Sequence, residues 1–207
     1  MILMVDEFDL TPNQLDAMRE IGNVGAGNAA TALSQVLNKK IDMNVPKVSL
    51  IPIEDVPDLV GGPDALIVAV FLRVYGKAPG NIHFLMPKEN AFFLADDLMG
   101  RPHGTTQELD EMSISAIKEV GNILSGSYLG AFSHFTNISM LPSIPSLAMD
   151  MAGAILNIVL LQLGQMGDRA MVIETKFLAE DDSINGHFFL VPDPGSLGTI
   201  VKAVGVE

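Results

Sequence analysis

The 207-residue sequence contains no cysteine. A disulfide framework, a thiolate nucleophile and a cysteine-based metal site are therefore excluded. Basic residues are also scarce, because 12 Lys and Arg stand against 25 Asp and Glu and give a formal net charge of -13. Affinity for a nucleic-acid backbone comes from Lys and Arg that displace counterions, so nucleic acid is a poor partner for this chain.

Long apolar runs are absent as well. The most apolar stretch, from Met151 to Leu163, is shorter than the about 20 residues that a membrane-spanning helix needs, so we expect no membrane insertion. A buried helix is the favoured interpretation of this stretch. A helix exposed to a partner protein is the alternative, because the stretch is apolar almost all round. The acidic start of the chain carries too short an apolar run for a secretory signal, which predicts a cytoplasmic protein.

The most informative feature is an internal repeat. Shifting the sequence by 99 positions places Glu20 on Glu119 and Asn23 on Asn122. Other identical pairs in this register are Ala17/Ala116, Gly22/Gly121, Gly27/Gly126, Ala32/Ala131, Ser34/Ser133, Asn38/Asn137 and Pro46/Pro145. Further along, the shift widens to 105 positions. We therefore expect residues 1–207 to form a single domain of two homologous halves, at about residues 10–100 and 109–207, joined by the segment 101–107.

Local signals predict a similar series of elements in each half. In the first half, Thr11 and Pro12 indicate the start of a helix to about Leu37, followed by a strand at 41–53, a hairpin at 65–75 and 81–86, and a short helix ending at Gly100. Pro46 predicts an edge position or a break in strand pairing. In the second half, helices at 109–135 and 147–163 precede strands at 170–178 and 187–191 and a last short helix. The expected fold class is α+β with α/β-like layers: long helices packed on a mostly antiparallel sheet and related by a pseudo-two-fold axis.

Four repeated positions share one face of each long helix. In the first helix they are Asp16, Glu20, Asn23 and Gly27, and in the second they are Ser115, Glu119, Asn122 and Gly126. Apolar and small residues on the other faces are expected to pack inward. Glycine inside a helix costs roughly 1 kcal/mol relative to alanine. The glycines of the first helix therefore predict that another part of the molecule approaches it closely.

An exposed glutamate and asparagine three positions apart are usually solvated surface residues. Their presence in two copies that have diverged elsewhere favours a functional role. Asparagine has no useful proton to lose, but its amide offers two donors and an acceptor in fixed geometry. This suits the positioning of a water molecule in line with a phosphoryl group, while the glutamate pairs with a cation on a partner. In this interpretation the partner provides both the metal and the phosphoryl group.

The repeated pattern Asp/Ser-x3-Glu-x2-Asn-x22-Pro, which ends at Pro46 and Pro145, is similar to that of the CheC/CheX/FliY phosphatases of chemotaxis. The likeness covers nearly the whole chain, and two full copies without a flagellar-switch domain resemble the CheC-like members most. The resemblance implies dephosphorylation of the response regulator CheY at its aspartyl phosphate. It also implies that Asn23 and Asn122 orient the attacking water, and that Glu20 and Glu119 pair with a CheY lysine. Magnesium is expected on the phosphorylated partner, and no metal or cofactor is expected on this chain.

The resemblance further implies binding of CheD, a chemoreceptor deamidase, through the apolar helix of the second half, with Asp150 as the contacting acid. A non-catalytic adaptor or inhibitor that sequesters CheY or CheD is the alternative function. A duplicated domain with neither partner is a third hypothesis. The internal two-fold already provides the symmetry of a dimer of half-chains, so we expect a monomer.

Overall fold

The computed structural model of the protein describes residues 10–163, 169–178 and 183–205. Its helices are α1 (Pro12–Leu37), η1 (Ile53–Asp55, a 3-10 helix), α2 (Val56–Leu59), α3 (Lys88–Leu98), α4 (Glu111–Thr136), α5 (Ala152–Leu163) and α6 (Ser196–Val204). Its strands are β1 (Asp42–Pro52), β2 (Leu66–Gly76), β3 (Gly80–Pro87), β4 (Met140–Pro142), β5 (Ser146–Met151), β6 (Arg169–Leu178) and β7 (Ser183–Pro192).

The strands form one seven-stranded sheet in the order β1-β6-β7-β3-β2-β4, with β5 also paired to β2. Every pairing among the described strands is antiparallel. Strands from the two halves of the sequence pair with each other, because β1 pairs with β6 and β2 pairs with β4 and β5. At the centre of the sheet β3 pairs with β7, where Phe84 lies opposite Phe188. The predicted class, with long helices on a mostly antiparallel sheet, is confirmed.

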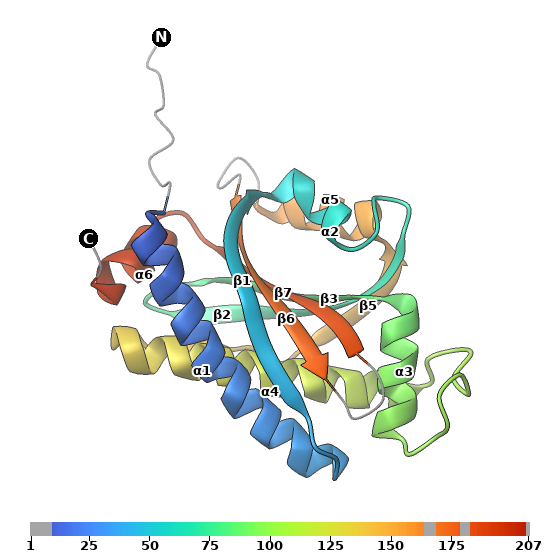
Figure 1. Ribbon diagram of the computed structural model, residues 1–207. Coiled ribbons are helices and arrows are strands. Elements are labelled where there is room, and N and C mark those ends of the chain that lie inside the picture. Colours follow the sequence, from blue (N-terminus) through green and yellow to red (C-terminus); the bar gives the residue numbers. More distant parts are fainter. Residues whose placement is uncertain (1–9, 164–168, 179–182, 206–207) are drawn as a thin grey trace.

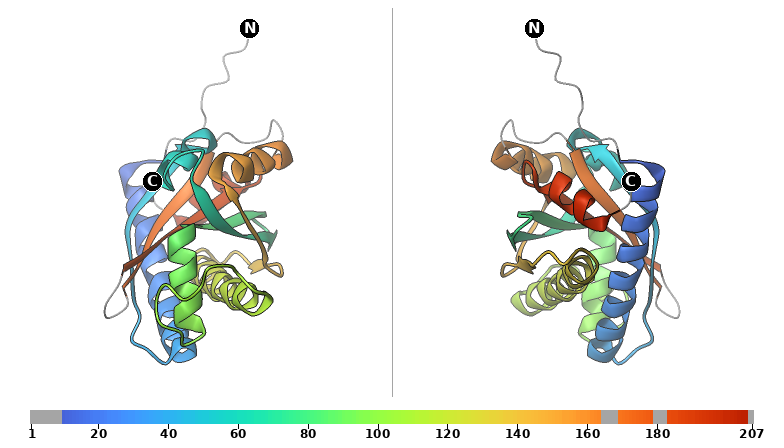
Figure 2. Two further views of the ribbon diagram at one scale, coloured as in Figure 1. Left: turned by 90° about the vertical axis from the view of Figure 1, so that its right-hand side faces the viewer. Right: turned by 90° about the vertical axis from the view of Figure 1, so that its left-hand side faces the viewer.

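Helices cover both faces of the sheet (Figure 1). The four helices α1, α3, α4 and α6 share a core with one face, and α2 and α5 share a second core with the other. Alternate residues of β2 enter opposite cores: Val68 and Val70 enter the first, and Ile67 and Ala69 enter the second. The side views of Figure 2 show α5 on the opposite side of the sheet from α1. The sheet is therefore a buried middle layer that fixes where both long helices lie.

The two long helices begin and end through matching local signals. α1 starts with a reciprocal cap, in which the Gln14 N–H donates to the Thr11 hydroxyl at 3.3 Å and the Thr11 N–H donates to the Gln14 side chain at 2.9 Å. α4 starts at Asp110, whose carboxylate accepts from the Ser113 N–H at 2.7 Å. Each helix ends in a left-handed asparagine, Asn38 with φ 50° or Asn137 with φ 55°. Asparagine tolerates this conformation better than most residues, so it stops the helix at little cost.

α1 and α4 pack directly against each other (Figure 1). A Cβ atom at Gly25 would lie 2.7 Å from Cδ1 and 3.0 Å from Cα of Tyr128, which is itself fully buried. The close approach predicted from the glycines of α1 is therefore confirmed at Gly25. Gly27, in contrast, has nothing within 4 Å of its would-be Cβ.

Pro46 behaves as its position in the sequence predicted. β1 is an end strand of the sheet, and its register against β6 shifts between Asn44 and Lys47. Proline has no N–H to contribute to a ladder, so an edge strand and an irregularity are both places where it is tolerated. Both expectations for Pro46 are confirmed.

The helix predicted at 147–163 is wrong at its start. Residues Ser146–Met151 form β5, which pairs with β2 from Phe71 to Leu66, and the helix begins only at Ala152. The pairing with β2 overrides local helix propensity here. The side chains of Ala152, Ile155 and Leu156 are buried against the sheet, which supports a buried helix over an exposed one for this part of α5. Among the described residues, no helix is long and apolar enough to span a bilayer.

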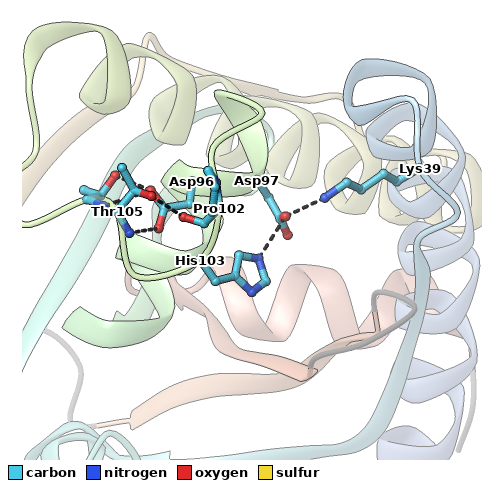
Figure 3. Close-up of polar contacts among 7 residues, drawn as sticks. Lys39, Asp96, Asp97, Pro102, His103 and Thr105 are labelled. Carbon is cyan, nitrogen blue, oxygen red and sulfur yellow. Dashed lines mark hydrogen bonds and ion pairs between the residues drawn. The ribbon is translucent and has the colours of Figure 1, made fainter.

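Two aspartates at the end of α3 hold the predicted joint between the halves in place (Figure 3). Asp96 is fully buried and accepts from the Thr105 N–H at 3.1 Å, the Thr106 N–H at 3.0 Å and the Thr106 hydroxyl at 2.6 Å. Burial by itself raises the pKa of the Asp96 carboxyl, but these hydrogen bonds, with one from the Gly104 N–H, hold its pKa below the ordinary value. The connection between the halves is therefore a fixed loop.

The neighbouring carboxylate, Asp97, ties the same loop to the end of α1. It accepts from Lys39 Nζ at 2.6 Å and lies 3.0 Å from Nε2 of His103 (Figure 3). Burial raises the pKa of Asp97, and the contacts with Lys39 and His103 lower it by more, so the net shift is downward.

Candidate functional site

The repeated face of α1 is the exposed one. Asp16, Glu20 and Gly27 are exposed and Asn23 is half-buried, as predicted for one stripe along the helix. Asp16 forms an ion pair with Arg19 at 3.1 Å. Within the described part of the chain, the Glu20 carboxylate has no hydrogen bond or ion pair. Glu20 is therefore available to a cation brought by another molecule.

Asn23 is held by the strand next to it. The main-chain N–H of Val45 in β1 donates to Asn23 Oδ1 at 3.1 Å. Because the amide oxygen is engaged, the amide orientation is fixed and its N–H groups remain available to donate. An amide fixed in this way can hold a water molecule in one position, which was the role inferred from the residue type alone.

The second stripe lies beside an open pocket. Ser115, Glu119 and Gly126 of α4 are exposed and Asn122 is half-buried. The pocket has a volume of about 440 Å³, and its lining residues are Ser115, Lys118, Glu119, Asn122, Pro142, Ser143, Ile144 and Pro145. The structure therefore brings the second Glu and Asn together with the proline that ends the sequence pattern.

The two stripes offer groups that can position a water molecule and a cation. The Ser143 hydroxyl in the pocket is already engaged, because it accepts from the Arg73 N–H at 2.9 Å and donates to the Ile144 carbonyl at 3.0 Å. Across the described residues, no three His, Asp or Glu side chains are grouped so that they could hold a metal ion. What each stripe offers is one free carboxylate and one amide on an exposed helix face, the groups that would bind a cation and a water molecule.

Both copies of the motif fall within matches to one family. The model of the CheC-like family matches residues 14–50 and 112–149. The chain is also 38% identical over 198 residues to the CheY-P phosphatase CheC of Bacillus subtilis, covering 94% of this chain and 95% of that protein. The chain belongs to the CheC-like family. The predicted family is thus confirmed.

Other relatives fit this assignment. The CheC-like chain is 33% identical over 120 residues to the flagellar motor switch phosphatase FliY of Bacillus subtilis, covering 58% of this chain and 31% of that protein. Among solved structures, FliY of Thermotoga maritima matches with a TM-score of 0.78 at 22% identity, over 96% of this chain and 98% of the other. The middle domain of FliM from H. pylori matches with a TM-score of 0.69 at 14% identity, over 94% and 99%. At these identities, the structural likeness shows a common fold.

Asp150 of this CheC-like protein lies in β5, two residues before α5 begins. Its side chain is exposed, and its carboxylate accepts from the Met151 N–H at 2.7 Å. The contacting acid inferred from the resemblance is therefore on an edge strand next to the apolar helix, and apart from both Glu/Asn stripes in the chain. The side chains of residues 158–163 lie outside the described residues.

Sequence reasoning missed the residue that holds the first asparagine. Val45 supplies the hydrogen bond to Asn23, whereas its counterpart Ile144 is 88% exposed and lines the same pocket as Asn122. Each stands directly before the proline of the pattern. The repeated proline was a usable signal: the break in pairing predicted at Pro46 applies equally to Pro145.

Proposed function

We propose that this CheC-like protein hydrolyses the aspartyl phosphate of phosphorylated CheY at two sites, one with Glu20 and Asn23 and the other with Glu119 and Asn122. The relative with 38% identity over nearly the full chain is a CheY-P phosphatase, and the related FliY protein is a flagellar motor switch phosphatase. The observation that carries the proposal is the Asn23 amide, fixed by the Val45 N–H beside a free carboxylate.

In the proposed reaction, a water molecule attacks phosphorus, and the bond between phosphorus and the aspartyl oxygen breaks. The products are inorganic phosphate, which carries away the protons of the water molecule, and the restored CheY carboxylate. The asparagine amide donates to the water oxygen and holds it in line with the breaking bond, and the glutamate pairs with a CheY lysine. Magnesium bound to CheY offsets the charge of the phosphoryl group. This chain contributes geometry and no covalent intermediate.

The test is the decay of CheY phosphate in the presence of wild type, Asn23→Ala, Asn122→Ala and the double variant. Removal of both amides is expected to reduce the acceleration on the order of a hundredfold, while each single variant retains the activity of the other site. Asn28→Ala is the matched control, because Asn28 is exposed on α1 outside the stripe. Decay in the double variant as fast as in wild type would refute the catalytic assignment.

A second proposal concerns CheD, which we place at Asp150 and the adjoining α5. Its support is the exposed carboxylate of Asp150 on an edge strand beside an apolar helix. The measurement is the affinity for CheD of wild type and Asp150→Asn, with Asp58→Asn on the exposed part of α2 as the control. Equal affinities in all three proteins would remove Asp150 from the interface.

The competing function is a non-catalytic adaptor or inhibitor that sequesters CheY or CheD. It predicts saturable binding of phosphorylated CheY with no faster decay, in wild type and double variant alike. In either case we propose that the two halves form one domain, since β1 pairs with β6 and β2 with β5. We also propose that the protein is cytoplasmic and monomeric. Sedimentation of the full chain at several concentrations checks the monomer.

A further inference from the structure

Each motif helix faces an edge of the sheet where one extra residue interrupts the pairing, within β1 in the first copy and between β4 and β5 in the second. In β1, two residues, Val45 and Pro46, lie opposite the single residue Thr175 of β6. At the opposite edge of the sheet, the three residues 143–145 lie opposite the two residues Leu72 and Arg73 of β2. An extra residue of this kind is a β-bulge, which bends the strand and releases its main-chain groups from the ladder.

In the first copy the bulge turns inward. The Val45 side chain is 3% exposed and lies over Gly22, where a Cβ would be 3.5 Å from its Cγ1. Gly22 and its counterpart Gly121, which directly precede the two asparagines, are called the motif glycines below. The Val45 N–H donates to Asn23 Oδ1 at 3.1 Å. Pro46 has no N–H to leave unpaired, and it favours an extended conformation for the residue before it. The bulge therefore supplies Asn23 with a donor without leaving a main-chain N–H of Val45 or Pro46 unpaired.

In the second copy the same bulge turns outward. Ile144 is 88% exposed. The residue before it remains attached to β2, because the Ser143 N–H donates to the Arg73 carbonyl at 2.7 Å. The space over the motif glycine is already filled, since a Cβ at Gly121 would be 2.7 Å from Cγ1 of Val70. Among the described residues, the Asn122 amide has no hydrogen bond, and it borders the 440 Å³ pocket instead.

We propose that the main-chain N–H of Val45 is the positioning group of the first site, and that the second site works without an equivalent. This inference rests on the proposed phosphatase function. With its oxygen held, Asn23 keeps its N–H groups in one orientation before the partner arrives. Asn122 must be ordered as the water is brought into line for attack, which costs conformational entropy at that step. The two sites therefore share their reacting groups and differ in preorganisation.

The first experiment detects the hydrogen bond without measuring activity. Amide hydrogen exchange at residues 45 and 144 is followed by NMR in wild type, Asn23→Ala, Asn23→Asp and Asn122→Ala. We expect Asn23→Ala to accelerate exchange at Val45 at least about tenfold, and Asn23→Asp to preserve protection because a carboxylate oxygen still accepts. Exchange at Ile144 should be fast and indifferent to Asn122→Ala. Unchanged exchange at Val45 in Asn23→Ala would overturn the proposal.

The second experiment measures the consequence for CheY phosphate decay in single-site proteins. In the Asn122→Ala background, replacing the Val45 N–H by an ester oxygen removes one hydrogen bond, and kcat should fall by about three- to tenfold with little change in KM. The same replacement at residue 144 in the Asn23→Ala background should change kcat by less than about twofold. Equal effects at both positions, or none at 45, would overturn the positioning role. If neither single-site protein accelerates decay before the replacement, the proposed function fails first and the positioning role fails with it.

Discussion

α1 and α4 carry the same exposed stripe, yet the rest of the molecule packs on them differently. Val45 of the neighbouring edge strand covers the motif glycine of α1, whereas Val70 of β2 covers that of α4. The residue that corresponds to Val45 in the second copy, Ile144 between β4 and β5, is exposed. A duplicated motif can thus retain its exposed face while the contacts behind it diverge, and in the proposed mechanism those contacts decide how well each amide is held.

The crossing of the two helices shows a second asymmetry. α1 contributes Gly25, and α4 contributes the fully buried Tyr128 that lies against it. In the repeat, Gly25 corresponds to Leu124 and Tyr128 corresponds to Ala29. At this crossing a small residue of α1 faces a large one of α4, which allows the close approach that a large residue on both helices would prevent.

The strongest test of this asymmetry is Gly25→Ala. The new methyl group would meet both the ring and the main chain of Tyr128, so we expect a loss of about 3 kcal/mol in the free energy of unfolding. Gly27→Ala, two residues along, meets open space and should stabilise the helix by up to about 1 kcal/mol. Urea denaturation of both variants measures the difference, and equal stabilities would mean that the helices do not approach as described.

Replacing the residue before each motif proline by alanine should have a different effect on stability at the two bulges. Val45→Ala removes two buried methyl groups, and we expect it to cost about 2 kcal/mol of unfolding free energy. Ile144→Ala removes an exposed side chain and should stay within about 0.5 kcal/mol of wild type. Chemical denaturation at one pH gives both values. A large loss in Ile144→Ala would show that the second bulge is packed inward in solution.

Replacing each motif glycine by alanine tests how closely the neighbouring strand packs on each helix. At Gly121 it would lie 2.7 Å from Val70, a stiff branched side chain, and we expect a net loss of about 1 kcal/mol. At Gly22 the nearest atom is at 3.5 Å, an ordinary contact, so Gly22→Ala should be neutral or slightly stabilising. Thermal unfolding followed by circular dichroism ranks the two variants, and the reverse order would contradict the assignment of Val70 and Val45.

The ends of α3 and α6 should respond differently to acid. α3 ends in Asp96 and Asp97, while the corresponding residues of α6 are Val201 and Lys202. Both aspartates have a pKa below the unfolded value of 3.8, so their contribution to stability is complete above that pH and is lost as the pH falls below it. We expect urea denaturation at several pH values to show this loss, and Asp96→Asn to diminish it. A pH profile unaffected by Asp96→Asn would contradict the role of Asp96.

Much of the fold followed from short-range signals. Thr11, Pro12 and the periodic stripe located α1, and Pro46 indicated an edge strand with an irregular register. The prediction failed at Ser146–Met151, where pairing with β2 determines the conformation of residues whose composition also suits a helix. The repeat itself contained the answer, because in the 99-residue register this segment corresponds to β1.

The sequence by itself determined which residues share a face of each long helix, because helical periodicity depends only on spacing along the chain. It therefore placed Glu20 with Asn23 and Glu119 with Asn122. Only the tertiary structure decided that a main-chain N–H of β1 holds Asn23 and that Asn122 borders an open pocket. Those contacts join residues distant in the chain, and they depend on the register of the sheet and on which valine fills the space above each glycine.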